Sequence, residues 1–247
     1  MRYLFILSTF LLVNHFFAQE TKKQLEITRL SKDAYAFTTY NEYKGYRVPA
    51  NGMYTVTCIG VVMIDTPWDT TQFQPLLDSI EKRHNKKVVL CISTHHHNDR
   101  TGGLEYYRSK GIKTFTSLQT LELCRQKGEK QPEFYFTQDT AFTLCDMSFV
   151  TYYPGQGHAQ DNIVVYAYKH GAYSSGILYG GCFVKSTEST DLGNLNDANV
   201  AAWETSVKKV QTKFGKSKTV IPGHFGWKGN SLKHTQKLIE KYLKGGK

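Results

Sequence analysis

An apolar strand that runs directly into three consecutive histidines is the feature that most constrains how this chain folds. The strand Val88–Ile92 is followed, two residues later, by the run His95-His96-His97-Asn98-Asp99. Side chains alternate in an extended segment, so we expect His95, His97 and Asp99 to project to one side. Two imidazoles and a carboxylate at the end of one strand are typical of a metal-ligand cluster.

Three later segments repeat the order of a strand, a glycine turn and a residue that can bind a metal. They end in Gly-Gln-Gly-His158, Tyr-Gly-Gly-Cys182 and Ile-Pro-Gly-His224. Taken alone, a histidine after such a turn is more often a surface or capping residue, and a lone cysteine is more often buried. Together with the first cluster they give six candidate ligands. Three neutral imidazoles suit one Zn²⁺ with an open position for water, and an aspartate, a cysteine and a histidine suit a second; the first set is His95, His97 and His158, and the second is Asp99, Cys182 and His224.

The remaining pattern mixes strands and helices along the whole chain. Strands are expected over residues 25–30, 34–40, 54–64, 87–93, 141–153, 162–168, 174–179 and 218–221, and helices over 70–84, 118–127, 198–214 and 231–243. A polar segment with Gly and Pro, between residues 40 and 54, predicts a hairpin with a long, mobile tip. No Pro- or Ser-rich linker divides the chain, so residues 19–247 are expected to form one α/β domain.

The N-terminus has the pattern of a secretory signal peptide. A basic start at Arg2 precedes a short apolar stretch, and the small residue Ala18 comes just before a strongly polar run. We expect residues 1–18 to be removed, with cleavage after Ala18. The alternative interpretation is a buried N-terminal helix. This is the only long apolar run and the mean hydropathy is −0.43, so a polytopic membrane protein is excluded.

The net charge of +10 comes mainly from the C-terminal segment, residues 203–247, which holds eleven lysines and two acids. A basic face can bind nucleic acid. Here, however, Lys233, Lys237 and Lys241 recur at helical spacing opposite leucines and an isoleucine, and no arginine or aromatic residue lies between them. We therefore expect a solvated helix face and no nucleic-acid partner.

The five cysteines form an odd set, which in an exported protein leaves at least one thiol unpaired. Cys58 and Cys91 lie inside apolar strand runs, and we expect both to be buried, inert thiols. The sequence leaves open whether any of Cys58, Cys91, Cys124 and Cys145 form a disulfide.

The run from Thr94 to Gly103 resembles the His-x-His-x-Asp signature of the metallo-β-lactamase superfamily, and His158, Cys182 and His224 follow in matching order. The chain is similar to the true metallo-β-lactamases of the di-zinc subclass, which includes carbapenem-hydrolysing enzymes, from about residue 25 to residue 243. Thioester and phosphodiester hydrolases of the superfamily usually carry a histidine after the signature aspartate and lack a ligating cysteine. Here the residues are Arg100 and Cys182.

The resemblance implies a four-layer αββα sandwich with two Zn²⁺ per chain at one edge of its two sheets. It implies that Asp99 is a catalytic residue as well as a ligand, and that Lys185 pairs with the substrate carboxylate. It further implies that Asn194 lies near the lactam carbonyl, that Asp65 supports the ligands from behind, and that the hairpin at residues 43–53 closes over the substrate.

The expected reaction is zinc-dependent hydrolysis of the β-lactam amide bond of penicillins, cephalosporins and carbapenems, which confers antibiotic resistance. Two metals about 3.5–4 Å apart lower the pKa of a shared water, so a zinc-bridged hydroxide can attack without an acyl-enzyme. The expected partner is a small-molecule β-lactam, and the mature protein is expected to be a periplasmic monomer with no membrane span. The alternatives are a thioester or phosphodiester hydrolase of the same fold, and an exported zinc-binding protein without activity.

Overall fold

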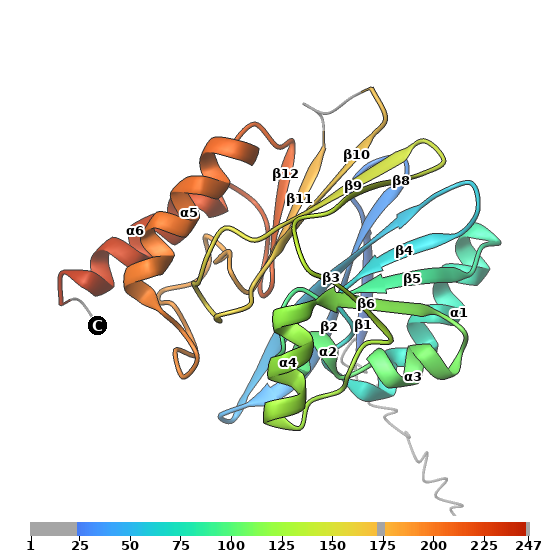
Figure 1. Cartoon of the computed structure of the whole chain (residues 1–247), viewed down its shortest axis with the longest axis horizontal. Helices are drawn as coiled ribbons and strands as arrows, with labels where there is room; N and C mark the ends of the chain where they lie inside the picture. The colour runs from blue at the N-terminus through green and yellow to red at the C-terminus, as the bar shows by residue number, and fades with distance from the viewer. Residues whose placement is uncertain (1–23, 172–175, 246–247) are drawn as a thin grey trace, which may run out of the picture.

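Two β-sheets pack face to face in the computed structural model, which describes residues 24–171 and 176–245 (Figure 1). The segment expected to be the signal peptide, residues 1–18, lies outside the described residues. The first sheet has the strand order β1-β2-β3-β4-β5-β6-β7, and the second has the order β12-β11-β10-β9-β8. The chain therefore builds the first sheet from its first half and the second sheet from its second half.

Each sheet combines antiparallel and parallel pairs. Strands β1 to β4 pair antiparallel, and β4 to β7 pair parallel. Strands β8 to β11 pair antiparallel, and β12 runs parallel to β11. The bounds are β1 (Leu25–Arg29), β2 (Ala34–Tyr43), β3 (Tyr46–Val56), β4 (Val61–Ile64), β5 (Val88–Ile92), β6 (Lys113–Ser117), β7 (Phe134–Phe136), β8 (Ala141–Leu144), β9 (Met147–Tyr152), β10 (Val164–Lys169), β11 (Ile177–Gly181) and β12 (Thr219–Pro222).

Helices cover the outer face of each sheet, as Figure 1 shows. The helices are α1 (Phe73–His84), which follows the 3-10 turn η1 (Thr70–Gln72), α2 (Asn98–Thr101), α3 (Leu104–Ser109), α4 (Leu118–Lys127), α5 (Val200–Phe214) and α6 (Ser231–Leu243). Apolar residues of α1 and α3 pack on the first sheet. Those of α5 and α6 pack on the second sheet.

The alternation of side chains along central strands explains why there are four layers. In β4, Val62 and Ile64 face the core between the sheets, while Val61 and Met63 face the helices. In β10, Val165 faces the core between the sheets and its neighbours face α5. A strand that is apolar on both faces must be covered on both. The predicted α/β sandwich with αββα layers is confirmed.

Two expected strands are hairpins in the structure. The apolar run 54–64 divides into β3 and β4 around a turn in which the Thr57 N–H donates to the carbonyl of Gly60 (2.8 Å). The run 141–153 divides into β8 and β9. Strands β6 and β7 and helix α3 were not expected from the sequence. Among the residues that the structure describes, none of the helices has both the length and the hydrophobicity that a membrane span requires.

A disulfide between Cys58 and Cys145 joins the turn between β3 and β4 to the turn between β8 and β9. Both cysteines are exposed, so the prediction that Cys58 is a buried thiol is wrong. The apolar residues on both sides of Cys58 looked like one continuous strand, so the turn at Cys58 was not predicted. Cys91 is buried and free, as expected. The bond joins the first sheet to the second near the start of β4. Asp65 follows the other end of that strand.

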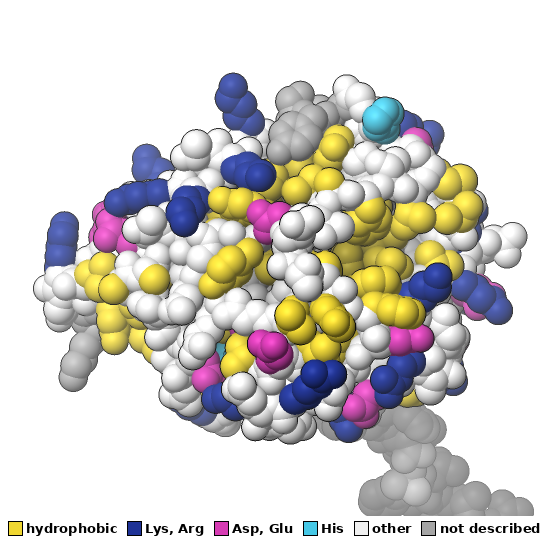
Figure 2. All heavy atoms as spheres, viewed as in Figure 1, with side chains coloured by type: hydrophobic (Ala, Val, Ile, Leu, Met, Phe, Trp, Pro, Cys, Tyr) yellow, Lys and Arg dark blue, Asp and Glu magenta, His cyan; other side chains and the backbone are white. Residues whose placement is uncertain are grey.

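The basic C-terminal segment forms the solvated face that the sequence predicts. Leu232, Leu238 and Ile239 of α6 are buried, and Lys233 and Lys237 are exposed. In Figure 2, lysine and arginine side chains stand away from the surface on the side of α5 and α6.

Candidate metal centre

Three imidazole nitrogens meet at the ends of β5 and β9. His97 Nδ1 lies 3.1 Å from His95 Nε2 and 3.2 Å from His158 Nε2. His95 and His97 follow β5, and His158 lies in the loop between β9 and β10. Asn162 shapes that loop, because its side chain accepts from the Ala159 N–H (3.0 Å) and donates to the Gly155 carbonyl (3.0 Å).

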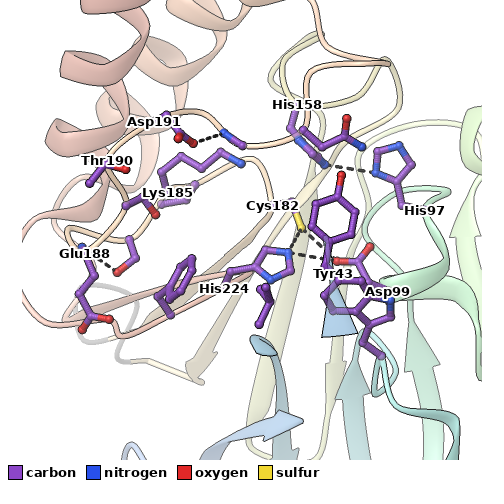
Figure 3. A pocket seen from close by; sticks show the side chains of 18 of the residues that line it. Tyr43, His97, Asp99, His158, Cys182, Lys185, Glu188, Thr190, Asp191 and His224 are labelled. Atoms are coloured by element: carbon purple, nitrogen blue, oxygen red, sulfur yellow. Dashed lines mark hydrogen bonds and ion pairs between the residues drawn. The ribbon is translucent and has the colours of Figure 1, made fainter. Parts of the chain in front are cut away.

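A second trio lies beside the first (Figure 3). Cys182 follows β11, His224 follows β12, and Asp99 comes from α2. Cys182 Sγ lies 3.3 Å from His224 Nε2 and 3.5 Å from Asp99 Oδ2, and the last two atoms are 3.2 Å apart. Gly223 allows this approach, because a Cβ there would stand 2.8 Å from Cys182 Sγ. Asp99 is not in an extended segment as expected, since α2 begins at Asn98; the helical turn directs the carboxylate to Cys182 and His224.

The separations suit zinc. Ligand atoms about 2.0–2.3 Å from a tetrahedral ion stand about 3.3–3.6 Å apart; the two separations from His97 Nδ1 in the first trio and all three in the second are 3.1–3.5 Å. Burial lowers the pKa values of His95, His158 and His224, so their rings are neutral, as metal binding requires. Burial raises the pKa of the Cys182 thiol, with Arg100 opposing, and a coordinated zinc would deprotonate it.

Both trios open onto a cavity of about 450 Å³. Lys185, which is only 9% exposed, and Asn194, which is exposed, line the same cavity. The wall on the first-sheet side includes Tyr43 and Trp68, whose rings pack at a centroid distance of 6.1 Å. The structure thus brings the six candidate ligands, Lys185 and Asn194 together.

The hairpin beside this cavity has a tight tip. Strands β2 and β3 continue to Tyr43 and from Tyr46, so only Lys44 and Gly45 form the turn. Both have positive φ values, 51° and 81°, which is the geometry that continues the strand twist in two-residue hairpins. The prediction of a long tip is therefore wrong, because most of the expected tip belongs to the paired strands β2 and β3.

Known proteins resemble the chain over almost its whole length. It is 40% identical over 227 residues to a metallo-β-lactamase type 2 of Elizabethkingia meningoseptica, covering 92% of this chain and 89% of the relative. The chain belongs to the metallo-β-lactamase family. It is 36% identical to metallo-β-lactamase IND-1 of Chryseobacterium indologenes, over 94% of this chain and 95% of that one. None of the family models compared matches the chain.

Solved structures agree with this membership. A metallo-β-lactamase from Pontibacter korlensis superposes with a TM-score of 0.82 at 35% identity, covering 88% of this chain and 99% of that one. The crystal structure of metallo-β-lactamase IND-7 superposes with a TM-score of 0.83 at 36% identity, covering 90% and 100%. The predicted family, fold and enzyme class are confirmed.

A fully buried arginine supports the second trio in this metallo-β-lactamase. Arg100 donates to Asp99 Oδ2 through Nη2 (2.6 Å) and Nε (2.9 Å), and to the carbonyls of Asn51 (2.6 Å) and Gly223 (3.0 Å). Although burial opposes it, Arg100 together with His224 holds the pKa of Asp99 well below its usual range. From the sequence, Arg100 could only be used to exclude other hydrolases, because this role depends on carbonyls of distant segments.

Asp65 lies behind the ligands, where the resemblance placed it. Its carboxylate accepts from the Thr94 N–H (2.7 Å) and the Tyr179 hydroxyl (2.8 Å), and lies 3.5 Å from Arg100. Burial raises the pKa of Asp65 to about 6, against the effect of Arg100 and these hydrogen bonds. Because Thr94 precedes His95, this carboxylate fixes the start of the ligand segment.

Asp197 contacts His97, although the sequence did not predict it as a site residue. Its Oδ2 lies 3.0 Å from His97 Nε2, and its Oδ1 accepts from Lys127 Nζ (2.9 Å). The hydrogen bond leaves Nδ1 of His97 as the nitrogen that faces His95 and His158. A carboxylate on the far nitrogen fixes both the tautomer and the orientation of a metal-binding imidazole. The only feature of the sequence that could have suggested Asp197 as a site residue is its place three residues after Asn194, a predicted substrate-binding residue.

Proposed function

We propose that the chain is a zinc-dependent hydrolase of the β-lactam amide bond that binds two Zn²⁺. His95, His97 and His158 would hold one ion, and Asp99, Cys182 and His224 the other. The observation that carries the proposal is the opening of both trios onto one cavity that also contains the buried Lys185. The relatives at 40% and 36% identity, both named metallo-β-lactamases, support the same conclusion.

When bound, zinc lowers the pKa of water and stabilises negative charge as the amide bond breaks. The side chains of the cavity then bind and orient the substrate. The ammonium of Lys185 offers a charged donor to the carboxylate that common bicyclic β-lactams carry near the lactam nitrogen. The Asn194 side-chain oxygen accepts from the Asn196 N–H (3.2 Å), which leaves its amide nitrogen free to donate toward the lactam carbonyl.

The proposed substrates are penicillins, cephalosporins and carbapenems, and their hydrolysis confers antibiotic resistance. The proposed location is the periplasm, reached through the signal peptide of residues 1–18, and the proposed state is a monomer. The disulfide between Cys58 and Cys145 supports export, since such bonds persist in oxidising compartments.

Steady-state rates of the purified zinc-loaded protein test this function. We expect turnover of nitrocefin and of one member of each drug class, and loss of turnover on chelation with recovery when zinc is restored. Two zinc ions per chain should be found by metal analysis. Absence of β-lactam turnover from a folded protein with two bound zincs would contradict the proposal.

Lys185→Ala tests how the substrate carboxylate is bound. A charge-assisted hydrogen bond contributes roughly 1.5–3 kcal/mol, so kcat/KM should fall about 10–150-fold. Much of the loss should be a raised KM, because the carboxylate is paired in both the ground state and the transition state. Lys185→Arg should recover part of it, and zinc content should stay at the wild-type value. Lys237→Ala, on the exposed face of α6, is the matched control. An unchanged KM in Lys185→Ala would refute this role.

A further inference from the structure

The charged groups of the cavity are separated along its length. Five of the six candidate ligands, all except His95, line one end, and Lys185 extends its ammonium toward them (Figure 3). On the other side of Lys185, the lining includes Glu188, Thr190 and Asp191. The cavity therefore has a cationic centre and an acidic far end, apart from the metals themselves.

The burial and position of the Lys185 ammonium suit it to bind a ligand. It is 9% exposed, and its Nζ lies 5.4 Å from the centre of the Trp203 ring. Nζ also stands 3.7 Å from where a Cβ of Gly193 would be, so the loop approaches closely there. Within residues 24–171 and 176–245, no hydrogen bond or ion pair engages this ammonium. A buried ammonium that faces an aromatic ring but has no hydrogen bond or ion pair, and that is directed into a cavity, calls for an anionic group of the ligand.

The two acids beyond Lys185 are held in place by backbone groups. Asp191 Oδ1 accepts from the Gly193 N–H (2.7 Å), and Glu188 Oε2 accepts from the Gly226 N–H (3.1 Å). Neither carboxylate has a lysine, arginine or histidine within ion-pair distance in the described part of the chain. Each carboxylate therefore faces the cavity without an ion-pair partner among the described residues, and its hydrogen bond to the backbone holds its position.

We propose that Glu188 and Asp191 form an acidic subsite that favours β-lactams with a cationic substituent beside the carboxylate. The inference rests on the proposed function. In cephalosporins and carbapenems, the variable substituent is on the carbon next to the one that bears the carboxylate, one bond further from the lactam nitrogen. With the lactam at the metals and the carboxylate at Lys185, that substituent points to Glu188 and Asp191. Zwitterionic β-lactams therefore match the charge order of the cavity.

The expected preference is moderate, because both carboxylates are exposed. A unit charge about 7 Å from a carboxylate, in surroundings close to water, gains about threefold in affinity. Two carboxylates together give about tenfold. Since exposed charges are screened by salt, the preference should shrink as ionic strength rises.

A matched pair of cephalosporins tests the subsite. Both share the nucleus and acyl side chain; one carries a quaternary ammonium joined through carbon, so that it is not expelled, and the other its neutral isostere. The measurement is the ratio of kcat/KM for the cationic over the neutral compound, with zinc-loaded protein. We expect a ratio of about ten for the wild type, about three for Glu188→Gln or Asp191→Asn, and about one for the double variant.

Glu204→Gln is the matched control, because Glu204 lies on α5, where it pairs with Lys208 at 2.6 Å. It should keep the wild-type ratio, and 0.5 M salt should lower the wild-type ratio toward one. A double variant with the wild-type ratio, or a wild-type ratio of one at low salt, would overturn the subsite. Failure of the wild type to hydrolyse either compound would overturn the proposed function instead, so the two failures can be told apart.

Discussion

Removing the disulfide between Cys58 and Cys145 should cost this protein much of its stability. The bond closes a loop across a sequence separation of 87 residues. It joins a turn of the first sheet to a turn of the second, and the loop that it closes contains strands β4 to β8. In the loop-entropy treatment, a bond over this length disfavours the unfolded chain by about 4.6 kcal/mol at 25 °C.

The test is urea unfolding of the oxidised protein and of the double variant Cys58→Ser, Cys145→Ser. Both cysteines are exposed in turns, so serine at these positions leaves no cavity and buries no hydroxyl. We expect the free energy of unfolding to fall by about 3–5 kcal/mol. A phosphine reductant should destabilise the wild type by a similar amount and leave the double variant unchanged.

The catalytic rate at low denaturant gives a second readout. The disulfide is at the end of β4 opposite to the metal centre, so kcat/KM for nitrocefin should stay within about twofold of the wild type. A double variant within about 1 kcal/mol of the wild type would refute the reasoning, since that is less than the smallest loss expected from closing so long a loop.

Three further outcomes are expected. Cys182→Ser should leave about one zinc per chain by metal analysis, because a serine hydroxyl stays protonated near neutral pH; two tightly bound zincs would contradict the ligand assignment. Arg100→Ala should lower the apo protein's unfolding free energy by about 3–5 kcal/mol, since it leaves two carboxylates buried without their cation; a loss below 1 kcal/mol would refute this. Asp197→Asn should raise the zinc dissociation constant of the three-histidine site about 10–100-fold, measured by competition with a chromophoric chelator; an unchanged constant would show that Asp197 does not position His97.

The candidate ligands could be identified from sequence because each follows a recognisable strand end. His158, Cys182 and His224 each come directly after glycine, and the resemblance to a known family joined them into two sets. The helices over residues 118–127 and 231–243 have the predicted bounds, because their apolar spacing and flanking residues are clear. Local pattern was sufficient in these places.

What the sequence could not give depends on contacts between distant segments. The pairing of Cys58 with Cys145 requires two turns to meet, and no spacing rule specifies which turns do. The role of Arg100 depends on the carbonyl of Asn51 in β3 and the carbonyl of Gly223 just after β12, both far from Arg100 in the sequence. Asp197 reaches His97 across 100 positions. The turn at Gly60 was missed because apolar residues continue on both sides of it.

The division of the ligands between the two halves of the chain has a consequence for how the molecule could be taken apart. The first half supplies His95, His97 and Asp99, and the second supplies the other three ligands. With the assignment proposed above, each zinc is a cross-link between halves, and neither half alone has a complete site. In the double variant Cys58→Ser, Cys145→Ser, which lacks the disulfide that joins the two halves, a cut between β7 and β8 would yield two separate fragments. Zinc would favour their reunion, and hydrolysis of a coloured substrate would report it. The fold is thus suited to a split reporter, in which zinc holds the two fragments together and restored hydrolysis reports their association.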